Sequence, residues 1–96
     1  MEIRWQSQAL TDLEAIQDYL LERNPPAALR LVAELREAAT RLVEHPNRGR
    51  PGRVPGTREL IVSGITYLIP YRVRGKVIEI LRVFHGARRW PDDFEK

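Results

Sequence analysis

At the start of the chain, polar and apolar residues alternate over a few positions, and apolar residues then recur with the spacing of an α-helix. Alternation over residues 2–5 predicts a short strand. Residues 7–22 then carry apolar side chains three or four apart, which share one helix face, namely Ala9, Leu13, Ile16 and Leu20. Ser7 is placed to act as the N-cap of this helix. The pattern therefore predicts a strand followed by an amphipathic helix.

A second helix is predicted to follow after a very short connection. Asn24 at the cap and Pro25 at the first helical position form a favoured start, and the helix should run to about Glu44. Its apolar stripe consists of Ala28, Val32, Leu35, Ala39 and Leu42. Because the connection is so short, the two helices should form an antiparallel hairpin.

The second half of the chain changes character. Residues 48–56 are too rich in Pro, Gly and Arg for helix or strand and predict a loop. Three β-branched and aromatic runs follow, separated at residues 63–64 and 74–76, which predicts a three-stranded antiparallel meander. Pro70 lies inside the second run, and because proline cannot donate to a ladder, we expect a bulge there.

These elements predict an α+β fold with a short N-terminal strand, a helical hairpin and a three-stranded antiparallel meander. The length of 96 residues fits one domain over residues 1–96. We expect residues 92–96 to be a flexible tail.

Charge is divided unevenly between the two halves. Residues 1–47 hold five Arg or Lys and eight Asp or Glu, a net of −3, whereas residues 48–96 hold eleven and five, a net of +6. Such separation favours an anionic partner on the sheet side, although a solvated cationic face with no ligand is the simpler alternative.

Several classes of site are disfavoured by what the chain lacks. There is no cysteine, so neither a disulfide framework nor a thiolate site is expected. His45 and His85 are the only histidines, and with no carboxylates at ligand spacing we expect no metal and no cofactor. No run approaches a membrane span and no signal peptide is recognisable, so we expect a cytoplasmic protein.

One group of residues could carry chemistry or bind a target. It combines a histidine and an indole near the C-terminus with arginines of the meander: Arg58, Arg72, Arg82, His85, Arg88, Arg89 and Trp90. Histidine could transfer protons near neutral pH, and arginine could stabilise a phosphorane, as in a metal-free ribonuclease. Each has a plainer interpretation, since His85 could bond to backbone, Trp90 could cover the core, and the arginines could hold acids.

The order and spacing of short motifs resemble those of the RelE/ParE superfamily of bacterial type II toxins, found in toxin–antitoxin and plasmid-stabilisation modules. The resemblance covers residues 2–91, and its most distinctive pieces are Ile3-Arg4-Trp5, Asn24-Pro25, Gly49-Arg50-Pro51, Gly56-Thr57-Arg58-Glu59-Leu60 and Ile80-Leu81-Arg82-Val83-Phe84-His85-Gly86-Ala87-Arg88. It implies a growth-inhibiting toxin that a cognate antitoxin neutralises.

The superfamily has two main branches, and the resemblance favours one. The ribonuclease branch cleaves messenger RNA on the ribosome with basic residues along its sheet, and those positions here are Glu59, Ile61, Leu68 and Ala87. None is basic, although Arg58 and Arg88 are adjacent and a one-residue slip would bring them in. The chain is thus more similar to the ParE-like branch, which poisons DNA gyrase, and we expect no catalytic residue.

Two further expectations concern partners. In this family an antitoxin segment wraps the toxin with apolar anchors and acids, and Leu10, Leu21 and Leu29 lie off the core stripes where they could receive it. The plainer interpretation is scattered surface leucines. Beside the ribosome-dependent endoribonuclease, a basic nucleic-acid-binding module remains an alternative function.

Overall fold

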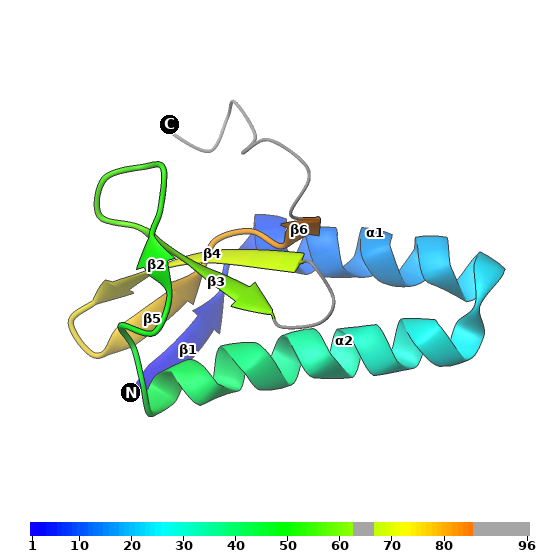
Figure 1. Ribbon diagram of the computed structural model, residues 1–96, viewed down its shortest axis with the longest axis horizontal. Coiled ribbons are helices and arrows are strands. Elements are labelled where there is room, and N and C mark those ends of the chain that lie inside the picture. The colour runs from blue at the N-terminus through cyan, green and yellow to red at the C-terminus, as the bar shows by residue number, and fades with distance from the viewer. Residues whose placement is uncertain (63–66, 86–96) are drawn as a thin grey trace.

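The computed structural model describes residues 1–62 and 67–85, and it consists of a helical hairpin packed against one face of a mixed sheet (Figure 1). The elements in chain order are β1 (Glu2–Trp5), α1 (Ser7–Arg23), α2 (Pro25–Thr40), the 3-10 turn η1 (Arg41–Val43), β2 (Arg50–Pro51), β3 (Arg58–Val62), β4 (Tyr67–Arg74), β5 (Val77–Ile80) and β6 (Phe84–His85). The predicted α+β fold with a strand, a hairpin and a meander is confirmed.

The sheet has the order β1-β5-β4-β3-β2, with β6 also paired to β4. Strands β3, β4 and β5 form the predicted antiparallel meander. The N-terminal strand β1 lies parallel to β5, with Ile3 opposite Ile78, and the chain between these two strands contains both helices and strands β2 to β4. The sequence did not predict this parallel pairing.

The core lies between the helices and the sheet, as the apolar stripes predict. Buried side chains from both layers form one cluster, which contains Ala9, Leu13, Leu35, Ala39, Leu42, Leu60, Val62, Ile69, Tyr71, Ile78, Ile80 and Val83. The helical members are those of the two predicted stripes, and the sheet members alternate along their strands. Burial of this apolar surface provides the main driving force for folding.

The predicted start of α2 is confirmed, whereas the predicted cap of α1 is not. The Asn24 side chain accepts a hydrogen bond from the Ala27 N–H, with Pro25 at the first helical position, as predicted. The prediction of Ser7 as N-cap was wrong, because Ser7 is already helical and Gln6 occupies the cap. The Gln6 amide instead donates to Glu79 on β5, so a tertiary contact replaces the local cap.

One predicted loop contains a strand, and the predicted tail is not tested by the structure. Residues 48–56 were predicted to contain no strand, yet Arg50 and Pro51 form β2 against Glu59 and Arg58. This pairing is possible because Pro51 ends a two-residue edge strand, where a missing N–H is tolerated. The predicted tail at residues 92–96 lies outside the described residues.

Pro70 interrupts the ladder on the side of β4 that faces β5 and β6, and the predicted bulge is present there. Strand β5 pairs through Ile80 with Tyr71, and β6 resumes with Phe84 opposite Leu68. Between these two pairs, Ile69 and Pro70 of β4 lie opposite three residues, 81–83. The one extra residue forms the bulge. Pro70 accepts a hydrogen bond from the Leu81 N–H at 2.9 Å, so its missing N–H lies on the side of the bulge.

Asp12 of α1 holds this bulge in place. Its carboxylate accepts hydrogen bonds from Arg82 Nε at 2.8 Å and Arg82 Nη2 at 3.1 Å, and from the Val83 N–H at 2.9 Å. The side chains of Asp12 and Arg82 are only 15% and 16% exposed. A bidentate, largely desolvated pair of this kind fixes geometry as well as contributing energy.

Tyr71 ties the arginine-rich loop to the centre of the sheet. Its fully buried hydroxyl donates to the Pro46 carbonyl at 2.7 Å and accepts from the Gly49 N–H at 2.8 Å. A Cβ on Gly49 would lie 2.7 Å from the Tyr71 ring and 2.9 Å from the Glu59 carbonyl, so only glycine fits there. Burial raises the pKa of Tyr71, and the Gly49 hydrogen bond and the Arg58 charge oppose that rise.

Replacing Asp12 should destabilise the fold substantially. Asp12→Ala leaves the Arg82 guanidinium and the Val83 N–H without their acceptor, which should cost about 2–3 kcal/mol of unfolding free energy. Urea denaturation measures this loss. The control Asp18→Ala, which changes an exposed residue of the same helix, should shift stability by less than about 0.5 kcal/mol. Equal stability of the two variants would contradict the assigned role.

Removing the Tyr71 hydroxyl should also weaken the fold. Tyr71→Phe keeps the ring but leaves the Pro46 carbonyl and the Gly49 N–H unpaired, at a cost of about 1–3 kcal/mol. Thermal denaturation at neutral pH measures the difference, and amide exchange at residues 46–50 should accelerate. A variant as stable as the parent protein would show that the hydroxyl does not anchor the loop.

The stability gap between the parent protein and Tyr71→Phe should narrow at alkaline pH. The raised pKa means that the folded state keeps the Tyr71 proton above pH 10, where the unfolded chain has lost it. The associated stability is therefore complete below pH 10 and is lost as pH rises through the folded pKa. Unfolding between pH 8 and 11.5 tests this, and Tyr19→Phe, at an exposed site, should show no such narrowing.

Candidate target and partner surfaces

The face of the sheet turned away from the helices, here called the outer face, carries most of the charged side chains of the strands. Alternation along the strands places on it Glu2 and Arg4 of β1, Val77 and Glu79 of β5, Arg72 and Arg74 of β4, Glu59 and Ile61 of β3, and Arg50 of β2. Acids are therefore interleaved with the arginines on this face, and the outer face is less cationic than the sequence half that forms it.

Glu79 is the centre of one charge cluster. Its carboxylate accepts hydrogen bonds from Arg72 Nε at 2.6 Å and from Gln6 Nε2 at 3.1 Å, and Arg74 Nε lies 3.5 Å away. The hydrogen bond from Arg72 lowers the pKa of Glu79, partial burial opposes it, and the charges of Arg72, Arg74 and Arg4 lower it further. Arg72, a predicted target-binding residue, is thus bound to an acid of its own domain.

A second acid, Glu59, is buried in the middle of β3. Its carboxylate pairs with Arg50, directly across from it on β2. Next to it in sequence, Arg58 turns toward the loop, where its guanidinium donates to the Gly49 carbonyl at 2.8 Å and to the Asn47 carbonyl at 3.3 Å. Arg58 therefore closes the loop together with Tyr71, and its charge lies close to backbone oxygens.

The remaining predicted target residues lie toward the C-terminus. Arg82 is held by Asp12, as described above. His85 is exposed at the end of β6, and its ring makes a T-shaped contact with the ring of Tyr67 at 5.5 Å between centroids. Arg88, Arg89 and Trp90 lie outside the described residues. Within the described part of the chain, the structure does not gather the predicted target residues into one pocket.

The positions matching the basic residues of the ribonuclease branch do lie together. Ile61 and Leu68 are direct partners across β3 and β4, and Glu59 is two residues from Ile61 on the same face. The fourth position, Ala87, lies outside the described residues. A carboxylate and two aliphatic side chains supply neither a proton donor near neutral pH nor a positive charge for a phosphorane.

The three leucines predicted to bind an antitoxin are all exposed. Leu10 and Leu21 lie on α1 and Leu29 lies on α2. Leu10 and Leu21 are eleven residues apart, about three helical turns, so they share one face of α1. Their role in binding stays a prediction.

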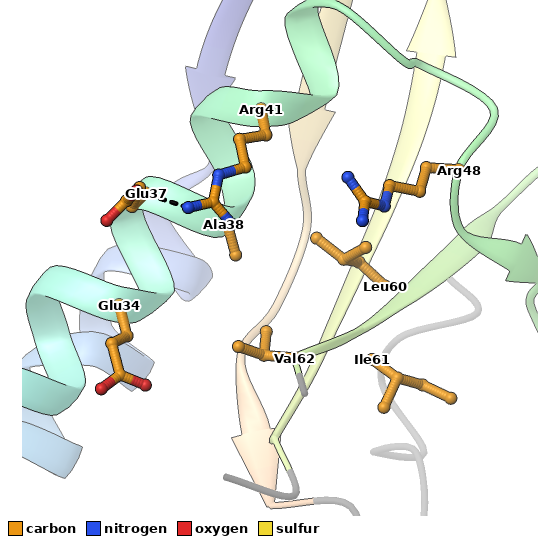
Figure 2. Close-up of a pocket in the computed structure, with 8 residues that line it drawn as sticks. All are labelled: Glu34, Glu37, Ala38, Arg41, Arg48, Leu60, Ile61 and Val62. Carbon is orange, nitrogen blue, oxygen red and sulfur yellow. Dashed lines mark hydrogen bonds and ion pairs between the residues drawn. The ribbon is translucent and has the colours of Figure 1, made fainter. Parts of the chain in front are cut away.

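A groove between α2 and the free end of β3 was not foreseen from the sequence. It has a volume of about 190 Å³ and is lined by Glu34, Glu37, Ala38, Arg41, Arg48, Leu60, Ile61 and Val62 (Figure 2). Neither a repeat nor a motif marks these residues, because they come from three separate segments. The helix period could have placed Glu34 and Ala38 one turn apart on α2, but not opposite β3.

Other structural residues were also missed by the sequence analysis. Asp12, Glu79, Gly49 and Tyr71 carry polar contacts that hold the domain together, yet none was predicted to have a structural or site role beyond membership of a family motif. Asp12 could have been noticed as an acidic residue directly before Leu13 of the predicted apolar stripe, where its side chain would lie close to the core. Gly49 could have been noticed as a glycine in a loop that must approach the sheet.

No group of three potential metal ligands is present in residues 1–62 and 67–85. Among the helices of the same part of the chain, none is long and apolar enough to cross a bilayer.

The chain is similar to several proteins that are named as toxins or that belong to a toxin–antitoxin system. The protein Y4kP of Sinorhizobium fredii is 45% identical over 89 residues, covering 93% of this chain and 92% of that protein. Toxin RelE2 of Caulobacter vibrioides is 40% identical over 87 residues, covering 91% and 97%. Among solved structures, a chain of the chromosomal ParDE toxin–antitoxin system from P. aeruginosa matches with a TM-score of 0.80 at 36% identity, covering 88% of this chain and 95% of that one.

The match to a family is equally extensive. Residues 3–90 match the family described as ParE toxin of type II toxin-antitoxin system, parDE. This range contains every described strand and helix apart from the first residue of β1. The chain belongs to the ParE toxin family and is the toxin of a type II toxin–antitoxin system.

Proposed function

We propose that this toxin inhibits growth by poisoning DNA gyrase and that it does not cleave messenger RNA. The observation that supports the proposal is the chemistry of the outer face. Glu59, Ile61 and Leu68 occupy the positions where the ribonuclease branch has basic residues. Glu59 is held in an ion pair with Arg50, and none of these three side chains supplies a positive charge to stabilise the negative charge that develops on the phosphate during cleavage.

The pairing of the sheet arginines supports the same choice. Arg72 is bound to Glu79 and Arg82 to Asp12, so their charges are partly neutralised before any target arrives. Nucleic-acid binding depends on cations that are free to replace counterions at phosphates. A protein target, in contrast, is recognised through a few desolvated anchors, among which arginine and tryptophan are favoured.

The contact surface that we propose for gyrase is the C-terminal end of the chain. His85 on β6 is its described member, and Arg88, Arg89 and Trp90 follow in sequence. A cognate antitoxin would neutralise the toxin, with Leu10, Leu21 and Leu29 as proposed contacts on the helical hairpin. The module would act in the cytoplasm, where gyrase works, and would stabilise the replicon that carries it.

Gyrase supercoiling in vitro tests the proposal. Rising concentrations of the toxin should inhibit supercoiling and trap cleaved DNA, and Arg88→Ala, Arg89→Ala or Trp90→Ala should reduce this inhibition by tenfold or more (about 1.4 kcal/mol per tenfold). Arg48→Ala is the matched control, since it removes an arginine near the loop and should leave inhibition unchanged. Each variant should keep the melting temperature of the parent protein.

Two results would contradict the proposal. Unchanged supercoiling with correctly folded toxin would remove the gyrase target. Discrete cuts within translated messages, detected by primer extension and lost in His85→Ala, would instead assign the toxin to the ribosome-dependent endoribonucleases.

A further inference from the structure

The N-terminal strand β1 forms one edge of the sheet. It pairs with β5 on one side, and no strand of the described part of the chain pairs with it on the other. The strand contains neither proline nor glycine, and its register with β5 is unbroken from end to end. Because proline, bulges and charges are the usual protection of a free edge, only the charges of β1 restrict what can pair with it.

Alternate residues of β1 direct their backbone groups out of the sheet. The N–H groups of Glu2 and Gln6 donate to carbonyl oxygens at the start and the end of β5, each at 2.9 Å. In a parallel ladder every second residue bonds to the same neighbouring strand, so Ile3 and Trp5 direct their N–H groups away from β5. Ile3 therefore offers a donor and an acceptor to a further strand, and Trp5 offers a donor.

The charged side chains of β1 are accessible on the outer face. Those of Glu2 and Arg4 are 57% and 59% exposed, and they pair with each other at 2.8 Å. An ion pair that is so exposed contributes little by itself, so both groups stay available to the charges of a partner. Met1, directly before the strand, is 49% exposed and adds apolar surface at the same edge.

We propose that β1 pairs with β1 of a second copy of this chain, antiparallel and about a two-fold axis at Ile3, so that the sheets of two toxins become one. Ile3 would exchange its outward hydrogen bonds with Ile3 of the second copy, and the Trp5 N–H would donate to its Met1 carbonyl. Glu2 would then lie directly opposite Arg4 of the second copy. The proposal goes beyond the proposed function and depends neither on gyrase nor on the antitoxin.

The backbone and the charges select the same register. In an antiparallel pair, residues with outward backbone groups must lie opposite one another, so Ile3 can face Met1, Ile3 or Trp5 of the second copy. The first register places Glu2 opposite Glu2, and the last places Arg4 opposite Arg4, and like charges directly opposite each other are destabilising. Only the register centred on Ile3 places opposite charges together on the outer face.

A second copy also satisfies this edge better than an unrelated strand. The same short segment supplies both the donors and the acceptors, both charges and the apolar side chains, as an isologous two-fold contact requires. The strand has four residues, so the contact is small, and we expect a reversible dimer with a Kd on the order of 10–100 µM.

Sedimentation of the free toxin from about 5 to about 500 µM tests the proposal over the range of that Kd. The unaltered chain should pass from monomer to dimer. Glu2→Arg places arginines opposite arginines across the two-fold axis, and it should weaken self-association by about tenfold or more. Glu14→Arg is the matched control, since it makes the same change of charge at an exposed position of α1 and should leave the dimer unchanged.

Mixing two variants tests the register itself. Arg4→Glu alone should also weaken self-association, because it places carboxylates opposite carboxylates. An equimolar mixture of Glu2→Arg and Arg4→Glu should form a heterodimer, since each arginine of one variant then faces a glutamate of the other. The double variant Glu2→Arg/Arg4→Glu should self-associate about as strongly as the unaltered chain. Circular dichroism verifies that each variant is folded.

Hydrogen exchange in the unaltered chain locates the contact without any variant. The amides of Ile3 and Trp5 should exchange about fivefold more slowly when the toxin is concentrated over the same range, because their N–H groups become bonded in the dimer. The amides of β3, which belongs to the other side of the sheet, should not change. This measurement decides the question even if a charge variant does not fold.

Three results would overturn the proposal. A toxin that stays monomeric over this range has no such contact. A dimer that Glu2→Arg leaves intact, or a mixture of the two charge variants that stays monomeric, would show that these charges do not face each other. Protection of β3 in place of Ile3 on concentration would assign self-association to the opposite edge. Gyrase inhibition is a separate readout, so failure of the gyrase proposal would leave these results unaffected.

Discussion

The Asp12 carboxylate and the bulge it holds determine how the two layers of the toxin are joined. Pro70 cannot donate to the ladder, so β5 ends at Ile80 and the chain needs another support before β6. Asp12 provides it from α1 by binding both the side chain of Arg82 and the backbone of Val83. The position of β6, and hence of His85, depends on this contact between the first helix and the last strands.

Arginines of the sheet are also paired with acidic residues of the same domain. Arg72 is bound by Glu79 and Arg50 by Glu59, and in each case the acid is the more buried partner. Such pairs cost desolvation energy and fix the orientation of long side chains more than they add stability. The surplus of positive charge in the second half of the chain is therefore a weaker indication of nucleic-acid binding than the sequence alone suggests.

Local patterns in the sequence were sufficient for much of the fold. The stripes of the two helices, the Asn24 cap, the meander and the bulge at Pro70 follow from residues close together in the chain, and the structure agrees. The parallel pairing of β1 with β5, the contact of Gln6 with Glu79 and the pairing of Asp12 with Arg82 join residues more than 69 positions apart. A single sequence contains no periodic signal for such contacts.

The candidate surfaces were harder to predict for the same reason. Exposure of Leu10, Leu21 and Leu29 followed from the helical period, but the partners of Arg58, Arg72 and Arg82 depended on tertiary structure. The groove between α2 and β3 follows only from knowing how the helices lie against the sheet. Sequence therefore indicated the family and the elements, while the structure separated paired arginines from those available to a partner.

The central claim is that the sheet arginines are occupied within the domain and that the toxin acts on a protein. Titration of the toxin with a labelled DNA duplex and a labelled RNA, followed by fluorescence anisotropy from 50 to 300 mM salt, tests it most directly. The account predicts weak binding at every salt concentration, with a shallow dependence corresponding to about one or two phosphate contacts. Tight binding that falls about a thousandfold over this range would show that many arginines are free to contact phosphates, and would contradict it.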